Sequence, residues 1–162
     1  MPEVICNTSP LQYLHQIGHL HIVPALAGKI IVPAAVEREL EAGKEAGVSL
    51  PDLRTLDWVT VRRPTSKPAL PLITDLGPGE TEVLMLALES SDSIVILDDG
   101  LARRFAETLN LRLTGTIGLL LDAKRAGLIS AVAPLLDQLQ ELRFRLASHT
   151  RRAALRSAGE DL

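Results

Sequence analysis

The chain has 162 residues, of which 46% are hydrophobic and only 2% are aromatic. This length is most simply one domain with a sizeable core, and a core of Leu, Val, Ile and Ala favours helices packed on a sheet over a sandwich or a barrel. The formal net charge of −3 excludes a global attraction to nucleic acid, so binding of that kind would need a local basic patch.

The cellular compartment is predicted from cysteine use and from apolar runs. Cys6 is the only cysteine in the sequence, which excludes an internal disulfide and is typical of a small buried side chain in a reducing compartment. The N-terminus lacks a basic region followed by a long apolar run, and no apolar stretch reaches the length of a membrane span. We therefore expect a cytoplasmic protein without a membrane partner.

The first half of the chain alternates short apolar runs with helical segments. Strands are predicted over Glu3–Cys6, Ile30–Val32 and Trp58–Val61. Helices are predicted from Pro10, with Ser9 as the cap, to Ile17, over His19–Ala27 and over Pro33–Gly43. A loop with one helical turn is predicted over 44–57, and an extended connection over 62–76, where Pro64, Pro68 and Pro71 lie.

The helix predicted over 78–89 carries one acidic side chain on its apolar face. It begins after Gly77 with a proline in its first turn, where the missing N–H costs nothing. Glu80 lies on the same stripe as the apolar residues three, four and seven positions later, so its carboxylate should face inward. Glu82 and Glu89 lie on the opposite stripe and should face water.

Polar side chains follow two of the predicted strands. Asp98 and Asp99 come directly after Ser93–Leu97, a strand whose apolar run is typical of burial on both faces. Asn7 follows the first strand in the same way. If the strand order reverses beside the first strand, these two ends are neighbours at the edge where open parallel sheets bind ligands. Glu80 would enter the same place, which predicts an acidic cleft.

The last third of the chain continues the alternation. Helices are predicted over Leu101–Leu109, over Thr116–Ala126 and from Ser130 to Leu142, with a strand over Leu111–Leu113. The whole pattern predicts an α/β fold with a parallel five-stranded sheet covered by helices on both faces. We expect a domain over 1–142 and a C-terminal tail over 143–162, a basic helix that packs on the domain or extends from it.

Converging carboxylates would need a cation. Glu39 joins the candidates because it stacks with Ala35 and Ala42, whose small side chains leave room for a carboxylate to reach inward. Two carboxylates about 4 Å apart repel by roughly 4 kcal/mol at an effective dielectric constant of ~20. Oxygen ligands with open positions suit Mg²⁺ or Mn²⁺, and the matching chemistry is attack of metal-activated water on a phosphodiester.

Purely structural roles for the same residues stay open. A glutamate such as Glu80 in a first helical turn is stabilised by the helix dipole alone. Asp98 and Asp99 would also serve as a turn and a helix cap, and Asn7 as a cap. The arginines of 143–156 would form either a solvated helix face or phosphate contacts.

In this order the motifs resemble those of the PIN domain, and within it a subfamily of unknown function. The resemblance spans nearly the whole chain and rests on Asn7-Thr8-Ser9-Pro10, Val32-Pro33 with Glu39-Leu40, Gly79-Glu80, Ile96-Leu97-Asp98-Asp99 with Ala102-Arg103, and Thr114-Gly115-Thr116-Ile117-Gly118. It implies a three-layer α/β/α fold and a ribonuclease that depends on Mg²⁺ or Mn²⁺. Many proteins of this kind are toxins held by small antitoxin proteins.

The resemblance also implies roles for individual residues. The acidic quartet corresponds to Asn7, Glu39, Glu80 and Asp99, with Asp98 beside it. The implied metal ligands are Asn7, Glu80 and Asp99, and the expected substrate contacts are Ser9, Arg103, Arg104 and Thr116. The sequence departs from the family pattern at Asn7, where the family has Asp, because Asn keeps one carbonyl oxygen but loses the charge and the bidentate reach of a carboxylate.

Two functions from different classes follow. The first is a metal-dependent endoribonuclease that cleaves RNA, a toxin-like component of a toxin–antitoxin pair weakened by Asn7. The second is a catalytically inactive module of the same fold that binds RNA or protein. Association as a homodimer is compatible with either. Metal-dependent cleavage of RNA by this chain and by its Asn7→Asp variant separates the two functions.

Overall fold

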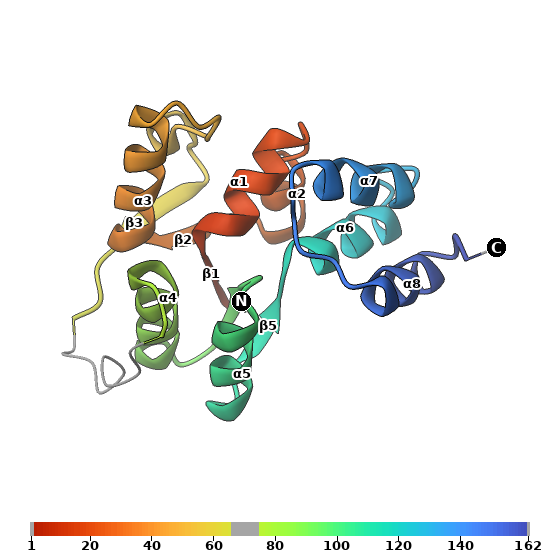
Figure 1. Ribbon diagram of the computed structural model, residues 1–162. Helices are drawn as coiled ribbons and strands as arrows, with labels where there is room; N and C mark the ends of the chain where they lie inside the picture. The colour runs from red at the N-terminus through yellow and green to blue at the C-terminus, as the bar shows by residue number, and fades with distance from the viewer. Residues whose placement is uncertain (1, 66–74, 162) are drawn as a thin grey trace.

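The structure is a computed structural model that describes residues 2–65 and 75–161 (Figure 1). Its five strands form one parallel sheet in the order β3-β2-β1-β4-β5. The strands are β1 Glu3–Cys6, β2 Ile30–Pro33, β3 Val59–Arg62, β4 Ser93–Ile96 and β5 Arg112–Thr114. The predicted parallel five-stranded sheet is confirmed, and each strand end lies within one residue of its prediction.

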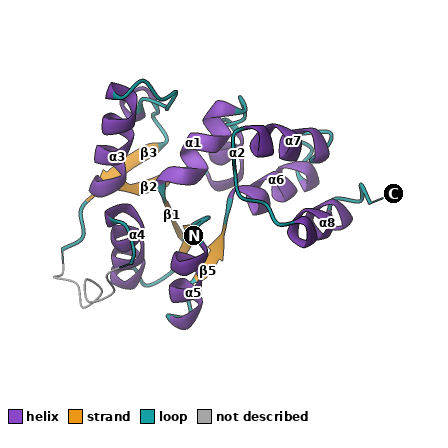
Figure 2. Cartoon of the chain, in the orientation of Figure 1, coloured by secondary structure: helices purple, strands orange, loops and turns teal. Residues whose placement is uncertain are grey.

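Helices connect successive strands and complete the C-terminal part of the chain (Figure 2). Within the described residues they are α1 Thr8–Gln16, α2 Ile22–Ala27, α3 Ala34–Glu45, the 3-10 helix η1 Leu53–Thr55, α4 Pro78–Glu89, α5 Gly100–Thr108, α6 Thr116–Arg125, α7 Ala133–Glu141 and α8 Ser148–Ser157. The single helical turn expected in 44–57 is η1. Pro68 and Pro71 of the expected extended connection lie outside the described residues.

Four predicted helix starts were wrong. The helix predicted from Ser130 begins at Ala133, with Val132 at the N-cap position. Asn7, not Ser9, occupies the N-cap position of α1. α2 begins at Ile22 rather than His19, because turns fill the residues between them. The basic tail is not helical from residue 143, since α8 begins only at Ser148. The backbone between α7 and α8 is instead a turn over residues 142–143 followed by a loop.

The central strands of the sheet are buried on both faces, whereas the edge strands β3 and β5 are largely exposed or half-buried. Alternate strand residues enter two separate apolar clusters, one on each face: the larger includes Cys6, Ile30, Val32 and Ile96, and the smaller includes Ile5, Ile31, Val95 and Leu97. Side chains of α4 and α5 complete the smaller cluster, and those of α1, α2, α3, α6, α7 and α8 complete the larger one. Figure 1 shows α4 and α5 on one side of the strands, so the architecture is the expected three-layer α/β/α arrangement.

The C-terminal helix packs on the domain rather than extending from it. Ala154 of α8 is buried in the larger cluster, and Lys124 of α6 bonds both Ala158 O, at 2.6 Å, and the Glu160 carboxylate, at 2.8 Å. The division of the chain at residue 142 stays a prediction. No helix among the described residues is long and apolar enough to cross a membrane.

Glu82 does not simply face water, as its place on α4 predicted. Its Oε1 accepts a hydrogen bond of 2.9 Å from the backbone N–H of Ala35, and Arg38 lies 3.8 Å from its Oε2. Glu82 therefore satisfies one of the free N–H groups at the start of α3. This role depends on the packing of α4 against α3, which helical periodicity within one segment does not report.

Candidate active site

The candidate site lies at the carboxyl edge of the sheet, between β1 and β4. The strand order reverses here, because β2 and β3 extend the sheet on one side of β1 while β4 and β5 extend it on the other. Cys6 pairs with Ile96, and the backbone N–H of Asn7 donates to Ile96 O at 3.1 Å. Asn7 and Asp98 thus leave neighbouring strands, which confirms the predicted adjacency. Open parallel sheets bind their ligands at such a reversal.

Asp98 is held in place by donors from two helices. Ser9 of α1 donates its hydroxyl to Asp98 Oδ2 at 2.9 Å. Thr116, at the start of α6, donates its backbone N–H to Oδ1 at 2.8 Å and its hydroxyl to Oδ2 at 2.6 Å. A Cβ on the preceding Gly115 would lie only 2.8 Å from Asp98 Oδ1. Charge-assisted hydrogen bonds and this close backbone approach therefore fix the position of the carboxylate.

Glu39 approaches the same edge of the sheet from α3, on the β2 side of β1. The Thr8 hydroxyl donates to its Oε2 at 2.5 Å, and the backbone N–H of Gly79 donates to its Oε1 at 3.0 Å. A Cβ on Gly79 would lie 2.8 Å from Glu39 Oε2 and 2.9 Å from Asn7 Oδ1. The first turn of α4 thus approaches both side chains at a distance that leaves room only for glycine.

Asn7 carries a buried oxygen without a hydrogen-bond donor. Only 3% of the residue is exposed, and its Oδ1 has no hydrogen-bond partner among the described residues. The side chain makes no capping hydrogen bond to α1, although Asn7 holds the N-cap position. A buried acceptor left unpaired costs about 1–3 kcal/mol. The oxygen is therefore available to a ligand that enters the site.

Predicted site residues line a common cleft of about 320 Å³, here called the first cleft. Its lining residues are Asn7, Ser9, Tyr13, Glu80, Asp98, Asp99, Arg143, Phe144 and Arg145. Glu39 and Thr116 are not among the lining residues. Thr116 holds the lining residue Asp98, and Glu39 bonds Thr8 and Gly79 behind Asn7. The structure thus brings the acidic candidates together at one edge of the sheet.

Asp99 combines an exposed position with a structural role. Its Oδ2 accepts a hydrogen bond of 2.9 Å from the backbone N–H of Ala102, so it caps α5. The capping role left open for Asp99 is thus present. Its Oδ1 makes no hydrogen bond among the described residues and remains free for a ligand in the first cleft.

The two predicted substrate-binding arginines are placed differently. Arg103 donates to Leu97 O at 2.8 Å and lines a second cleft, of about 540 Å³, that shares Asp98, Phe144 and Arg145 with the first. Arg104 is exposed and lines neither cleft.

Arg143, Phe144 and Arg145 were not identified as site residues from the sequence. The sequence predicts a basic helix there, with its arginines on a solvated face or in contact with phosphates. In the structure these residues instead belong to residues 142–147, which connect α7 to α8 and are here called the strap. Arg143 has a φ of 68°, which ends the helical path without a glycine. The available signal was an aromatic residue between two arginines in a chain with only 2% aromatics.

The side chains that line the first cleft are of the chemical types that bind a hard divalent cation. They offer oxygen donors, and one of these, Asn7 Oδ1, is buried without a partner. Among residues 2–65 and 75–161, no group of three or more His, Cys, Asp or Glu side chains is close enough to hold a metal ion. A cation here would thus be held by fewer than three such side chains, together with the Asn7 oxygen.

Comparison with known proteins agrees with the fold. The model of a family described as a PIN domain matches residues 3–160. No protein with a curated description matches the chain significantly. The family match covers almost every residue that the structure describes, including all five strands and each candidate acidic residue. The resemblance that the sequence motifs indicated is thus confirmed, and the chain belongs to the PIN domain family.

Proposed function

We propose that the chain is a metal-dependent endoribonuclease whose activity is weakened by Asn7, and that it acts as the toxin-like component of a toxin–antitoxin pair. PIN domains are generally nucleases that depend on a divalent metal, bind RNA and often pair with antitoxins. The observation that supports the proposal best is the unpaired, buried Asn7 Oδ1 in a cleft that Glu80, Asp98 and Asp99 also line.

The residues that would hold Mg²⁺ or Mn²⁺ are Asn7, Glu80 and Asp99. When bound, the ion would polarise a phosphate oxygen and lower the pKa of a bound water. Asp99 offers its free Oδ1, and Glu80, in the first turn of α4, makes no hydrogen bond to the described residues.

The remaining site residues position these groups. Thr8 and Gly79 fix the Glu39 carboxylate behind Asn7, and Glu39 would orient a water molecule or complete the set of ligands. Ser9 and Thr116 fix Asp98 between the two clefts. A site that is fixed before the substrate binds needs little reorganisation during the reaction.

The test compares the chain with its Asn7→Asp variant. Adding one charge about 4 Å from a divalent ion contributes several kcal/mol at an effective dielectric constant of ~20, so Asn7→Asp should raise Mn²⁺ affinity by roughly tenfold or more. Calorimetry with Mn²⁺ measures the affinity, and a single-turnover assay with labelled RNA measures cleavage. The double variant Asn7→Asp, Glu80→Gln is the matched control, which should lose both gains.

The outcomes separate the proposal from its alternative. Metal-dependent cleavage that is slow in the chain and faster in Asn7→Asp supports the nuclease. Equal Mn²⁺ affinity in the two proteins, without cleavage by either, would rule it out.

The alternative function is a catalytically inactive module that binds RNA or protein. Two observations favour it: Asn7 contributes no charge, and the described residues contain no cluster of three metal-binding acidic side chains. RNA binding by the chain without cleavage, and without rescue by Asn7→Asp, would establish this function instead.

A small antitoxin protein, a homodimer and a cytoplasmic location complete the proposal. An antitoxin that blocks the first cleft should prevent RNA from binding to the chain. Competition between the purified antitoxin and RNA for the chain would measure this. Sedimentation of the chain alone would reveal a homodimer.

A further inference from the structure

The strap forms a wall that the two clefts share. Asp98, Phe144 and Arg145 line both clefts, whereas Arg143 lines only the first and Arg103 only the second. A ligand longer than one cleft would pass Asp98 and Arg145 on its way to the other. Arg145 is therefore the basic residue at the junction of the two clefts.

Apolar contacts hold the strap in place. The Phe144 ring packs edge-on against Tyr13 of α1, with ring centroids 5.0 Å apart and an interplanar angle of 89°. Phe144 and Leu146 both pack against the larger apolar cluster. Phe144 and Leu146 are partly buried, whereas Arg145 between these two anchors is exposed at the cleft.

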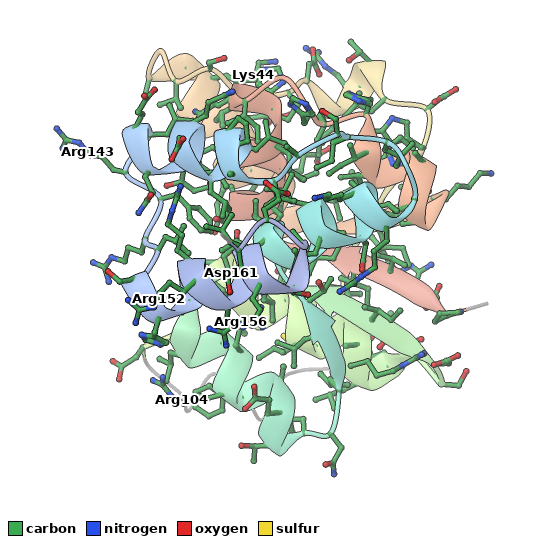
Figure 3. The ribbon with its side chains drawn as sticks, turned by 90° about the vertical axis from the view of Figure 1, so that its right-hand side faces the viewer. Lys44, Arg104, Arg143, Arg152, Arg156 and Asp161 are labelled. Carbon is green, nitrogen blue, oxygen red and sulfur yellow. The ribbon has the colours of Figure 1, made fainter. Side chains whose placement is uncertain are left out.

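Among the described residues, the strap arginines Arg143 and Arg145 have no acidic partner, unlike most other arginines. Among the described residues, acidic side chains pair with Arg38, Arg54, Arg62, Arg112, Arg125, Arg151 and Arg156. Arg143 and Arg145 form no ion pair and no hydrogen bond within the described parts of the chain. Figure 3 shows Arg143 on the same side of the molecule as Arg152 and Arg104, but these last two line neither cleft.

The two clefts differ in their lining in a way that suits a nucleotide chain. The first is lined mainly by polar and charged residues, whereas the second also contains Leu113, Ile117 and Leu146 beside Arg103 and Arg145. Bases bind to apolar and aromatic surfaces while arginines bind the backbone phosphates. The second cleft has the lining expected for a base that flanks a phosphate held at the junction.

We propose that Arg145 is a positioning residue for the RNA backbone: it holds the phosphate at the junction of the two clefts, beside Asp98, and the adjoining nucleotide occupies the second cleft. This inference rests on the proposed binding of RNA and goes beyond it by naming the residue and the path. Arg103 is a poorer candidate for the same role because its guanidinium already binds Leu97 O.

The experiment measures binding of a short fluorescein-labelled single-stranded RNA by anisotropy at several salt concentrations. The variants are Arg145→Ala, Arg145→Lys and the matched control Arg152→Ala. Arg152 is an exposed arginine of α8 that has no ion pair within the described residues and lines neither cleft. Arg145→Ala should weaken binding roughly tenfold, as loss of a charge-assisted phosphate contact predicts. It should also reduce the slope of log affinity against log salt by about one.

The charge-conserving variant separates phosphate contact from a structural role. Arg145→Lys should restore the salt slope, because lysine keeps the charge, but only part of the affinity, because lysine lacks the planar fork of donors. Arg152→Ala should change the affinity less than about twofold. In the Asn7→Asp background, Arg145→Ala should lower the rate of RNA cleavage at subsaturating RNA while leaving Mn²⁺ affinity unchanged.

Two results would overturn the inference. If the chain binds RNA but Arg145→Ala and Arg152→Ala have equal affinities and salt slopes, the role of Arg145 is wrong and the proposed nuclease stands. If the chain binds no RNA and Asn7→Asp cleaves none, the proposed function fails and the inference fails with it.

Discussion

Thr116 donates two hydrogen bonds to the carboxylate of Asp98, one from its backbone N–H at 2.8 Å and one from its hydroxyl at 2.6 Å. The first residue of α6 thus positions the acidic residue that follows β4. Thr116 is completely buried, so no water replaces its hydroxyl if it is removed. The pair links the stability of the α6 start to the geometry of the candidate site.

Replacing Thr116 with valine should destabilise the protein while Thr116→Ser should not. Valine keeps the shape and the backbone hydrogen bond but leaves Asp98 Oδ2 with only the Ser9 donor, at a cost of about 1–3 kcal/mol. Urea denaturation at neutral pH measures the difference. Thr108→Val is the control, since the Thr108 hydroxyl is exposed and bonds only Arg104 O. Equal losses in Thr116→Val and Thr108→Val would contradict the prediction.

Gly79→Ala should destabilise the protein although alanine is the better helix former. A helix interior gains about 1 kcal/mol when Gly is replaced by Ala, but the added Cβ would lie 2.8 Å from Glu39 Oε2 and 2.9 Å from Asn7 Oδ1. Gly100→Ala in the first turn of α5 is the control, because its nearest neighbour is a side-chain atom at 3.7 Å. The midpoint of thermal unfolding should be lower than that of the parent in Gly79→Ala but not in Gly100→Ala. A midpoint at or above that of the parent would mean that Asn7 and Glu39 move aside without cost.

Asp99→Asn should separate the capping role of Asp99 from its predicted role at the metal. Asparagine caps helices as well as aspartate does, so stability should change by less than about 0.5 kcal/mol, whereas Asp99→Ala should lose about 1 kcal/mol. In the Asn7→Asp background, both changes should lower Mn²⁺ affinity because each removes a charged ligand. Calorimetry of Asp98→Asn in the same background completes the comparison. Unchanged Mn²⁺ affinity in Asp99→Asn, with loss in Asp98→Asn, would move the ligand role to Asp98.

Glu160 should make the stability of the protein depend on acidic pH. Hydrogen bonds from Lys124 and from the backbone N–H groups of Val132 and Ala133 lower the pKa of Glu160 to about 2. An unfolded glutamate titrates near ~4.3, so this stabilisation is complete above that pH and is lost as the pH falls towards 2. Glu160→Gln should cost about 2 kcal/mol at pH ~7 and almost nothing at pH ~2.

Denaturation of the parent and of Glu160→Gln at a series of pH values measures this dependence. Glu141→Gln is the control, since Glu141 is exposed and lacks an ionic partner among the described residues. A stability difference between parent and Glu160→Gln that stays constant with pH would show that the carboxylate charge does not contribute.

The rate at which the Cys6 thiol is modified should measure global unfolding. The residue is fully buried, and burial, reinforced by the charge of Asp98, raises the pKa of its thiol well above the ordinary value. Because the thiolate is the reactive form, Ellman's reagent should react with the native protein only as fast as the molecule unfolds. Rates with and without denaturant measure this, and rapid reaction in native buffer would reveal local opening of β1.

The sheet and the position of the acidic cleft were predictable because local signals specified them. Short, mostly apolar segments marked the strands. Asn7 and Asp98 are neighbours because the strand order reverses beside β1, the condition on which their predicted adjacency depended. The capping of α5 by Asp99 followed from its place just before a helix. These features depend on one segment at a time or on a general rule of topology.

Other parts of the site depend on contacts between distant segments. Glu82 caps α3 only because α4 packs beside it, which no stripe on α4 alone reveals. The backbone leaves the helical path at Arg143, which has a positive φ. Because this residue is not a glycine, the sequence did not mark the turn. Arg143 and Arg145 consequently were assigned to a helix, and their place in the first cleft emerged only from the structure.

The wide spacing of the site residues along the chain bears on synthesis by the ribosome. Ser9 meets Asp98 across 89 residues, Thr116 follows later, and the strap completes the cleft walls only at residues 142–147. A nascent chain that has not yet released the strap from the exit tunnel cannot form either complete cleft. Any activity of this site would thus be withheld from the messenger RNA being translated until the last part of the domain has emerged.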